Sequence, residues 1–410
     1  MYDAVVVGAR CAGSPTAMLL ARKGYRVLLL DKATFPSAMP MSTHLIHQPG
    51  IARLKRWGLR DRLPASHCSP VTHYQFDLGA CTLTGCPPPA EDTTEAYAPR
   101  RTILDKILVE AAVEAGVELR EAFAVQELVR EGEQVVGIRG HTPGGSNLTE
   151  KARIVIGADG MHSLVARAVH APEYKNLPPL QETYFAYWSG VSMKGLEFYP
   201  RAYRAAYGWP THDNLVLVGV NWVARDFAEV RADIEGHFFQ VLDMAAPDLA
   251  VRLREGRRES RWIGGSINNY FRKPYGSGWA LVGDAGYKKD PGTAAGITDA
   301  FRDAELLVQA IDDGFSERQP LVEALAGYER KRNEAAMPVY EFTCEIVRFE
   351  PPTLEQQHLF NALRNNQKDT NRFFGLIARL HPSQSSSRRR ISNGSLKEGQ
   401  CDRSGRGYKV

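Results

Sequence analysis

Two carboxylates in this chain directly follow short apolar runs. Asp31 ends the run Tyr25–Leu30, and Asp284 comes two residues after Trp279–Val282. Open α/β sheets bind ligands at the carboxyl ends of their strands, so both side chains are candidates for holding a cofactor hydroxyl. A helical pattern begins near Ala294, and the N–H groups at such a helix start attract anions and electron-rich oxygens. The spacing therefore predicts a cofactor pocket.

The N-terminus has the spacing of a dinucleotide-binding βαβ unit. The segment GARCAG separates the apolar run Ala4–Val7 from a helical pattern, and Asp31 closes the second strand. In such units the glycines permit a tight turn beside a pyrophosphate, and the acid holds a ribose hydroxyl. Gly8 and Gly13 fit this pattern, whereas Arg10 replaces the middle glycine. Its guanidinium could pair with phosphate; the alternative is a strand–turn–helix that binds no cofactor.

Composition narrows the classes of protein. The 410 residues are 43% hydrophobic and carry a net charge of +4, all of it from the last thirty residues. The near-neutral remainder argues against a nucleic-acid partner. Six cysteines without CxxC or metal spacing indicate reduced thiols, no metal site and a cytoplasmic protein. We also expect no signal peptide and no integral membrane segment.

The elements expected around these motifs define an α/β fold. We predict a Rossmann-like FAD/NAD(P)-binding domain with an inserted, mostly antiparallel β-sheet substrate domain and C-terminal helices. The cofactor domain is assigned to 1–177 and 276–350, and the aromatic-rich insert, with one helix near 224–243, to 178–275. Residues 351–380 are expected to form a C-terminal helix. Residues 381–410 are polar, basic and aperiodic, which predicts disorder.

Three motifs occur in order: GARCAG with Asp31, GADGMHS at 157–163 and GDAGYKKDP at 283–291. Together they resemble class A FAD-dependent monooxygenases of the aromatic hydroxylase type, which share a superfamily with FAD-dependent halogenases and geranylgeranyl reductases. The resemblance spans roughly residues 1–380. It implies FAD as cofactor and NADPH or NADH as co-substrate.

The resemblance also implies roles for residues in the first half of the chain. Asp31 would hold the adenosine ribose with Lys32 beside it, Arg101 would lie near the ribityl and pyrophosphate groups, and Val125 would contact adenine. Asp159 belongs to a motif that handles both FAD and NAD(P)H, although Asp-Gly is also a good turn. The pyrophosphate would lie on the first turn, at Gly8, Arg10, Cys11, Ala12 and Gly13.

The last motif would surround the flavin. Asp284, after Gly283, matches the carboxylate that binds a ribityl hydroxyl, and Pro291 lies where the family lines the flavin ring. The N–H groups of Gly296 and Ile297 match those that contact the N1–C2=O edge. A helix N-terminus there would stabilise the negative charge of reduced flavin.

No catalytic residue is defined by the sequence. His44 and His47 precede a helical segment that passes near the flavin ring in the family, so either could help to deprotonate a substrate. Packing at the helix start is the alternative. Tyr287 stands where many members carry histidine, and two lysines follow it. These three side chains are expected either to bind an anion or relay a proton, or to face solvent.

The activity implied by the resemblance is hydroxylation of an aromatic or polyketide-like small molecule with O₂, through a flavin C4a-hydroperoxide, by a monomer or homodimer. Two other flavin reactions stay open. One is a geranylgeranyl-reductase-like double-bond reduction, which needs a long apolar groove. The other is halogenation, although the chain has a single Trp209-Pro210 and no WxW element. A non-catalytic cofactor-binding regulator is the remaining alternative.

Overall fold

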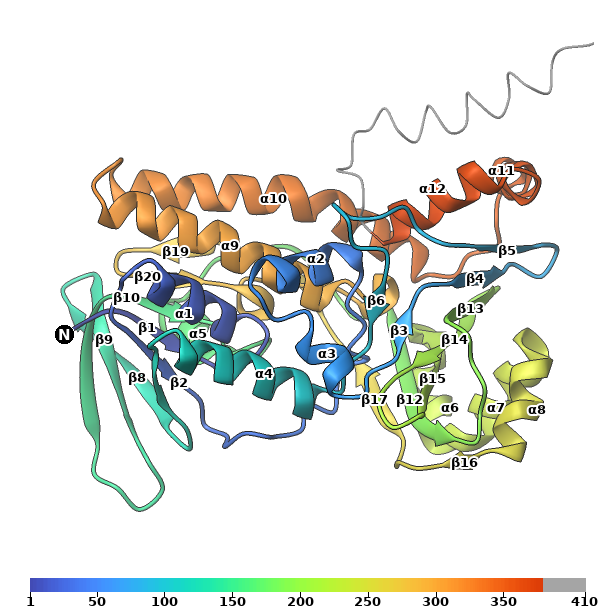
Figure 1. Cartoon of the computed structure of the whole chain (residues 1–410), viewed down its shortest axis with the longest axis horizontal. Helices are drawn as coiled ribbons and strands as arrows, with labels where there is room; N and C mark the ends of the chain where they lie inside the picture. Colours follow the sequence, from blue (N-terminus) through green and yellow to red (C-terminus); the bar gives the residue numbers. More distant parts are fainter. Residues whose placement is uncertain (379–410) are drawn as a thin grey trace, which may run out of the picture.

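The computed structural model describes residues 1–378, which form two main sheets side by side (Figure 1). The first sheet is mostly parallel and is built on apolar strands, as buried parallel strands require. Its edge pair, β19 and β20, is antiparallel, and so is the ribbon described below, which pairs with the first part of β10. In spatial order its strands are β19 (Tyr275–Gly276), β20 (Trp279–Leu281), β10 (Leu148–Gly157), β1 (Tyr2–Val7), β2 (Val27–Leu30) and β7 (Glu118–Arg120). This sheet is the predicted Rossmann-like core.

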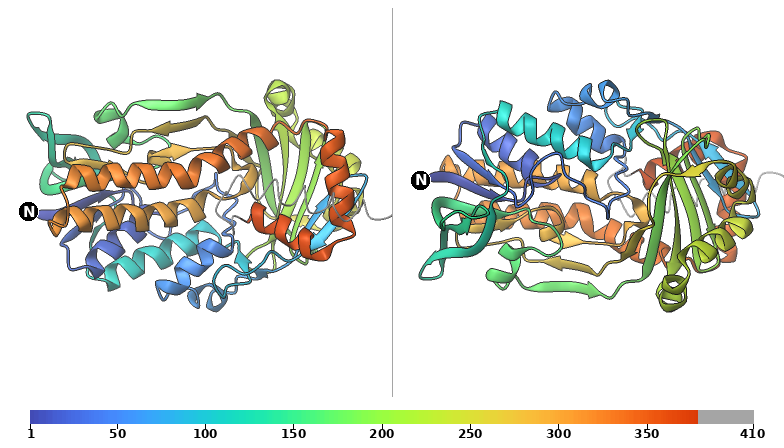
Figure 2. Two further views of the ribbon diagram at one scale, coloured as in Figure 1. Left: turned by 90° about the horizontal axis from the view of Figure 1, so that it is seen from above. Right: turned by 90° about the horizontal axis from the view of Figure 1, so that it is seen from below.

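Helices cover one face of this sheet, and a β-ribbon with one short helix covers the other. The long helices α9 and α10 run side by side (Figure 2). The helices on the first face are α1 (Gly13–Arg22), α2 (Gln48–Arg56), α3 (Arg62–Ala65), α4 (Arg101–Glu114), α9 (Gly296–Phe315) and α10 (Leu321–Ile346). The ribbon consists of β8 (Ala124–Glu131) and β9 (Gln134–His141), and α5 (Leu164–Ala168) packs beside it.

The second sheet is antiparallel except where β13 meets β4. Its order is β16 (Arg257–Arg258), β12 (Gln181–Ser189), β15 (Val216–Val223), β14 (Arg204–Pro210), β13 (Leu196–Arg201), β4 (Tyr74–Asp77) and β5 (Thr82–Gly85), with β17 (Ile263–Ser266) also on β12. The sheet is thus wider than the aromatic-rich segment suggested. Residues 74–85 supply two of its strands because their alternating apolar side chains complete its inner face.

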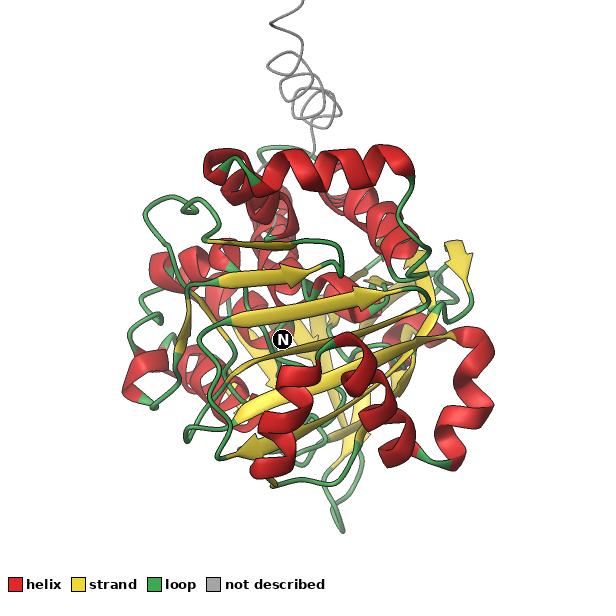
Figure 3. Cartoon of the chain, turned by 90° about the vertical axis from the view of Figure 1, so that its right-hand side faces the viewer, coloured by secondary structure: helices red, strands yellow, loops and turns green. Residues whose placement is uncertain are grey.

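The two faces of the second sheet pack against different partners. Ala186 and Trp188 of β12 face an outer core with α7 (Ile234–Ala245) and α8 (Pro247–Glu255), whereas Phe185 and Tyr187 face inward. Figure 3 shows the outer helices in front of the strands. The single helix expected over 224–243 is interrupted: α6 (Phe227–Ala232) stops at Asp233, which has extended backbone and caps α7 by accepting a hydrogen bond from Gly236 N–H at 2.9 Å.

Three smaller groups complete the described chain. Strands β11 (Glu173–Leu177), β18 (Asn269–Arg272) and β21 (Tyr287–Lys288) form a short sheet, and β3 (Pro70–Val71) pairs with β6 (Ala96–Tyr97). The expected C-terminal helix is two helices, α11 (Leu354–Arg364) and α12 (Gln367–Ile377), because the Asn366 side chain caps a new helix start. The basic segment 381–410 lies outside the described residues. Among residues 1–378, no helix is long and apolar enough to cross a membrane.

Candidate functional site

The three sequence motifs meet at one edge of the parallel sheet. Val7 of β1 pairs with Leu30 of β2 on one side and with Gly157 of β10 on the other, and Gly157 pairs with Leu281 of β20. The strands therefore end in one row. The segments that follow them carry Gly8, Asp31, Asp159 and Asp284, so parallel pairing gathers residues that are far apart in the sequence.

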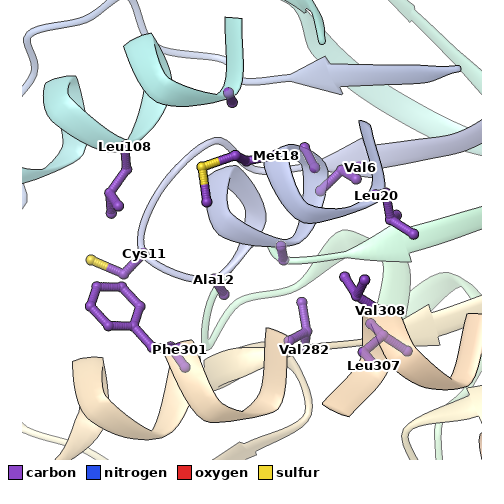
Figure 4. Packing of buried hydrophobic residues seen from close by; sticks show 14 of the residues in the cluster. Val6, Cys11, Ala12, Met18, Leu20, Leu108, Val282, Phe301, Leu307 and Val308 are labelled. Carbon is purple, nitrogen blue, oxygen red and sulfur yellow. The ribbon is translucent and has the colours of Figure 1, made fainter. Parts of the chain in front are cut away.

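Glycines make close contact between the motifs possible. A Cβ on Gly8 would fall 2.5 Å from the carbonyl oxygen of Ala158, and one on Gly13 would fall 1.7 Å from the carbonyl oxygen of Gly8. A Cβ on Gly283 would lie 2.7 Å from the Cβ of Ala12, which joins the first motif to the third. Figure 4 shows Ala12 and Cys11 in the turn that precedes α1, near Phe301 of α9. No other residue type fits at these three contacts without a shift of backbone.

The start of α1 is available to an anion. Within residues 1–378, no side chain caps this helix, which begins at Gly13 directly after the glycine turn. Unpaired N–H groups at a helix start bind phosphate well. The turn therefore fits the pyrophosphate group that the fingerprint predicts, even though Arg10 replaces the middle glycine.

Asp31 holds the turn in place. Its Oδ2 accepts a hydrogen bond from Ala9 N–H and its Oδ1 accepts one from Ala33 N–H, both at 2.8 Å. A carboxylate has about four acceptor positions, so it can still accept a ribose hydroxyl. Phe123 N–H donates to the Asp31 carbonyl at 2.9 Å, which brings the start of β8, and with it Val125, beside this acid. Lys32 is exposed next to it.

Arg10 and Arg101 are held together by a residue that the sequence analysis did not single out. Asp105, which is fully buried, accepts from Arg101 Nε at 2.9 Å and from Arg10 Nη1 at 2.7 Å. Arg10 also donates to Ser37 Oγ at 2.9 Å. The Cys11 thiol lies 3.5 Å from the same carboxylate. Asp105 stands four residues after Arg101, a spacing that places two side chains on one face of a helix, and this spacing was the available signal.

The loop after β20 leaves room at its far end. No described atom lies within 4 Å of the position that a Cβ on Gly296 would take, and no described side chain caps α9 at this point. Gly296 and Ile297 are the first two residues of α9, and Pro291 begins the short helical turn before it. Asp284, expected to hold a ribityl hydroxyl, forms an ion pair with Lys288.

Asp159 has a structural partner. Its Oδ2 accepts hydrogen bonds from the N–H groups of Leu164 at 2.6 Å and Val165 at 3.3 Å, so it caps α5. Its Oδ1 is buried and has no hydrogen-bond partner among the described residues. Burial raises the pKa of this carboxyl. Asp159 therefore orders the second motif through its capping contacts.

Tyr287 and Lys289 are buried, so the solvent-facing alternative is wrong for these two side chains. Tyr287 is buried and stacks on Phe271 with ring centroids 4.8 Å apart, and its hydroxyl oxygen accepts from Arg302 Nη2 at 3.0 Å. Lys289 is buried in an ion pair with Asp299. The polar groups of Tyr287 and Lys289 bind α9 and fix the loop to it, whereas Lys288 pairs with Asp284.

The two histidine candidates have different surroundings. His47 is buried, with Nδ1 2.9 Å from the Tyr74 hydroxyl and Nε2 3.0 Å from the Thr293 carbonyl, which fits the packing alternative. His44 Nδ1 lies 2.9 Å from the Ala98 carbonyl, and its Nε2 lies 2.9 Å from the hydroxyl of Tyr187. Burial lowers the pKa of His44 to about 3, so the ring is neutral.

Tyr187 lines a cavity of about 530 Å³ between the two main sheets. Arg101 of the cofactor edge also lines it, as do three residues not identified from the sequence: Arg100, Ser260 and Arg261. The cavity therefore connects the predicted cofactor site with the inner face of the second sheet.

Within residues 1–378, no group of three or more potential ligands could hold a metal ion.

Known proteins share this fold. Residues 1–199 match the family described as the FAD binding domain. Digeranylgeranylglycerophospholipid reductase 1 of Methanopyrus kandleri is 25% identical over 368 residues, which cover 85% of this chain and 91% of that protein. The crystal structure of p-nitrophenol 4-monooxygenase PnpA from Pseudomonas putida DLL-E4 aligns with a TM-score of 0.77 at 18% identity, over 94% of this chain and 99% of that one. The flavin-dependent brominase Bmp2 aligns with a TM-score of 0.76 at 19% identity, over 96% and 93% of the two chains.

A further relative matches less than half of the chain. The protein FixC of Salmonella typhi is 32% identical over 173 residues, and this match spans 38% of FixC and 40% of this chain. The family match assigns an FAD-binding domain to residues 1–199, which contain the first two sequence motifs of this α/β fold. The relatives and structures named above that match most of this chain are 25% identical to it or less, so they establish its fold. Its glycine contacts, uncapped helix starts and open space at Gly296 fit FAD.

Proposed function

We propose that this protein is an FAD-dependent monooxygenase that uses NAD(P)H and O₂ to hydroxylate an aromatic small molecule. The observation that carries this proposal is the cavity beside Arg101. Arg101 lines it on the side of the predicted cofactor site, and Tyr187 lines it on the side of the second sheet. A molecule inside the cavity would therefore lie between the cofactor site and that sheet. At about 530 Å³ it has the size of a small-molecule pocket.

The lining of the cavity favours hydroxylation over reduction of an isoprenoid chain. A molecule with long isoprenoid chains needs an extended apolar groove. This cavity is instead bounded by Arg100, Arg101 and Arg261, with apolar contacts from residues such as Leu215 and Ile263. Burying hydrocarbon against charged guanidinium groups is costly, which supports a compact and partly polar substrate.

The chain's own residues would bind the cofactor and orient the substrate. The turn at Gly8–Gly13 and the start of α1 would hold the pyrophosphate, and the N–H groups of Gly296 and Ile297 would face the electron-rich edge of the flavin. When bound, FAD would supply electron transfer and oxygen activation. Tyr187 and the arginines would place the substrate and limit access of water, which protects a reactive oxygen species from decay.

The test is a turnover assay on the purified holoprotein. We expect flavin absorbance in the protein as isolated, and faster NADPH or NADH oxidation with some members of a panel of phenols and aromatic acids. Under ¹⁸O₂, the product should gain one labelled oxygen, and hydrogen peroxide should not account for all of the NAD(P)H consumed. If no compound accelerates flavin reduction or gains oxygen, the monooxygenase proposal is wrong. A colourless protein that takes up no FAD would contradict every flavin-dependent reaction considered for this chain.

Double-bond reduction is a second candidate, supported by the match to an archaeal lipid reductase over 91% of its length. Double-bond reduction predicts that the product gains no oxygen, whereas hydroxylation predicts that it gains one oxygen atom. Chemically reduced holoprotein would be reoxidised by a geranylgeranyl lipid under anaerobic conditions, with loss of double bonds in the lipid. A hydroxylase would show neither reoxidation nor loss of double bonds in that experiment.

A further inference from the structure

Asp290 differs from the other acids of the third motif and of the first turns of α9, because it has no ion-pair partner. Within residues 1–378, the other acids of the segment 283–303 are all paired: Asp284 with Lys288, Asp299 with Lys289, and Asp303 with Arg302. Asp290 is 1% exposed and forms no salt bridge in the described chain. A buried carboxylate without a cation is unusual, because burial disfavours its charged form.

One carboxylate oxygen of Asp290 is held by a side chain, and the other has no partner. Asp290 Oδ2 accepts from Asn269 Nδ2 at 2.7 Å, and Asp290 N–H donates to Asn269 Oδ1 at 2.6 Å. Oδ1 is buried and forms no hydrogen bond with the described residues, and neither does the side-chain amide of Gln181. Gln181 Nε2 lies beside the same turn, 3.8 Å from the position that a Cβ on Gly292 would take. Buried polar atoms are rarely left unused, so Oδ1 is where a proton would bind without breaking a hydrogen bond.

The cations beside Asp290 compensate little of its charge. Lys288 acts on Asp290, but its ammonium group is bound to Asp284. Lys289 is bound to Asp299. The charged residues of the neighbouring strands β12 and β18 also have partners of their own: Glu182 pairs with Arg231, and Arg272 pairs with Glu173. Each of these cations is therefore already matched by another carboxylate.

Helix α10 packs against the same loop and supplies no ion-pair partner either. Arg348 is exposed, and the buried Arg332 donates to backbone carbonyls and neutral side chains. Tyr340 and Cys344 face Asp290, and both are neutral because burial raises the pKa of each, to about 11 for Cys344. Burial is also the main cause that raises the pKa of Asp290 from 3.8 to about 6. This carboxyl can therefore gain or lose a proton near neutral pH.

Asp290 directly precedes the residues that are expected to meet the flavin. Pro291 is next in the chain and begins the short helical turn that leads to Gly296, the first residue of α9. Reduction places negative charge on the flavin edge assigned to this helix start. A like charge nearby disfavours the ionised form of a carboxyl. Reduction should thus tighten proton binding by Asp290, and a proton on Asp290 should favour reduction by the same factor.

We propose that Asp290 takes up a proton at Oδ1 when bound FAD is reduced and releases it when FAD is oxidised again. Two electrons and one proton pass from the electron donor and solvent to FAD, and a second proton passes from solvent to Asp290. The O–H bond is the only bond formed at Asp290. Loss of the carboxylate charge thereby balances the charge gained on reduction. This inference rests on FAD binding and goes beyond the proposed reaction.

The test is the pH dependence of the reduction potential of the holoprotein, measured without oxygen against a reference dye and with a chemical reductant. Each proton taken up with two electrons lowers the potential by 29.6 mV per pH unit. If reduction raises the pKa of Asp290 from about 6 to about 7, the wild type at about pH 6.5 takes up about 0.5 proton more than Asp290→Asn. The slope of the wild type should therefore be steeper by about 15 mV per pH unit or more.

A matched control and a second measurement identify the group that binds the proton. Glu345→Gln removes an exposed acid next to Cys344 on α10 and should keep the wild-type slope. Infrared difference spectra of the wild type, reduced minus oxidised, should show the C=O band of a protonated carboxyl that shifts in D₂O. This band should be absent in Asp290→Asn. The band in the wild type tests the proposal even if Asp290→Asn fails to hold FAD.

Equal slopes in the wild type and Asp290→Asn would overturn the proposal, as would reduction of the wild type without a new carboxylic-acid band. A slope that changes as much in Glu345→Gln would also overturn it, because the effect would then come from surface charge. The measurements use neither oxygen nor substrate, so they separate the two proposals. Proton uptake by Asp290 without oxygen incorporation would contradict only the monooxygenase proposal, and oxygenation with equal slopes would contradict only this one.

Discussion

Arg101 donates two hydrogen bonds to Asp105, one turn further along α4. Nε lies 2.9 Å from Oδ1, and Nη2 lies 3.1 Å from Oδ2. Arg10 completes the cluster by donating to the same buried carboxylate. One acid between two guanidinium groups fixes both of them and leaves a net positive charge beside the uncapped start of α1. Arg10, which stands in place of the middle fingerprint glycine, thus contributes a cation where the cofactor pyrophosphate is expected.

Replacing the shared acid should weaken FAD binding. In Asp105→Asn the two arginines lose the charge that holds them, so we expect the Kd for FAD to rise by about tenfold to a hundredfold. The Kd is measured by quenching of flavin fluorescence on titration into apoprotein. Glu110→Gln, on an exposed position of the same helix, is the control and should keep the wild-type Kd. Equal affinity in Asp105→Asn would show that the arginines do not contact the cofactor.

Two glycines near the cofactor should respond differently to alanine. Gly13→Ala places a methyl group 1.7 Å from the Gly8 carbonyl oxygen, so the apoprotein should lose about 2 kcal/mol or more of unfolding free energy. Gly296→Ala meets no described atom within 4 Å and should leave apoprotein stability close to wild type. It should nevertheless weaken FAD binding, because the methyl group enters the space assigned to the flavin. Urea denaturation and FAD titration measure the two effects. Normal FAD affinity in the Gly296→Ala variant would mean that the flavin does not bind next to Gly296.

The sequence was sufficient to predict the mostly parallel sheet and the residues at its edge. Each apolar run ends directly before a glycine or an aspartate, and the parallel pairing of such runs places their ends together, as Val7, Leu30, Gly157 and Leu281 do. The local pattern therefore determined the row of strand ends.

The cavity could not be predicted in the same way. Arg100 and Arg261 are separated by 160 positions, and no periodicity relates them. Their proximity depends on how the second sheet packs against the first. The buried state of Tyr287 also has a tertiary cause, since it depends on Phe271 from a different strand and on Arg302 from α9. A site that is formed by side chains from different helices and strands has no local sequence signal.

The buried pair that ties the third motif to α9 should contribute to stability. Lys289→Met leaves Asp299 buried without its lysine partner, and we expect the free energy of unfolding to fall by about 3 kcal/mol, at the lower end of the usual range because Arg302 still faces this acid. The measurement is urea denaturation of the holoprotein. Lys331→Met, on an exposed position of α10, is the control. A loss no larger than in the control would mean that the ion pair contributes nothing to stability.

Two buried groups should give the protein opposing pH dependences. The pKa of His44 is lowered by burial to about 3 from 6.5, so between these values the unfolded chain binds a proton that the folded protein does not. Stability from this residue is fully present above pH 6.5 and decreases as the pH falls, by up to about 1.4 kcal/mol per pH unit. Burial raises the pKa of Asp290 to about 6 from 3.8, so its contribution is present at low pH and is lost as the pH rises from 4 to 6.

Single variants should separate these two contributions. His44→Gln removes the histidine term, so between pH 4 and 6 the unfolding free energy of this variant should rise less with pH than that of the wild type, or should fall. Asp290→Asn removes the opposing term, so its unfolding free energy should rise more steeply over the same range. Urea denaturation at half-unit pH steps measures both slopes. If the slopes of the two variants match the wild type, neither group changes its protonation between the folded and unfolded states over this range. A parallel series with Lys331→Met, which changes no group that titrates below pH 7, checks that the slope differences come from His44 and Asp290.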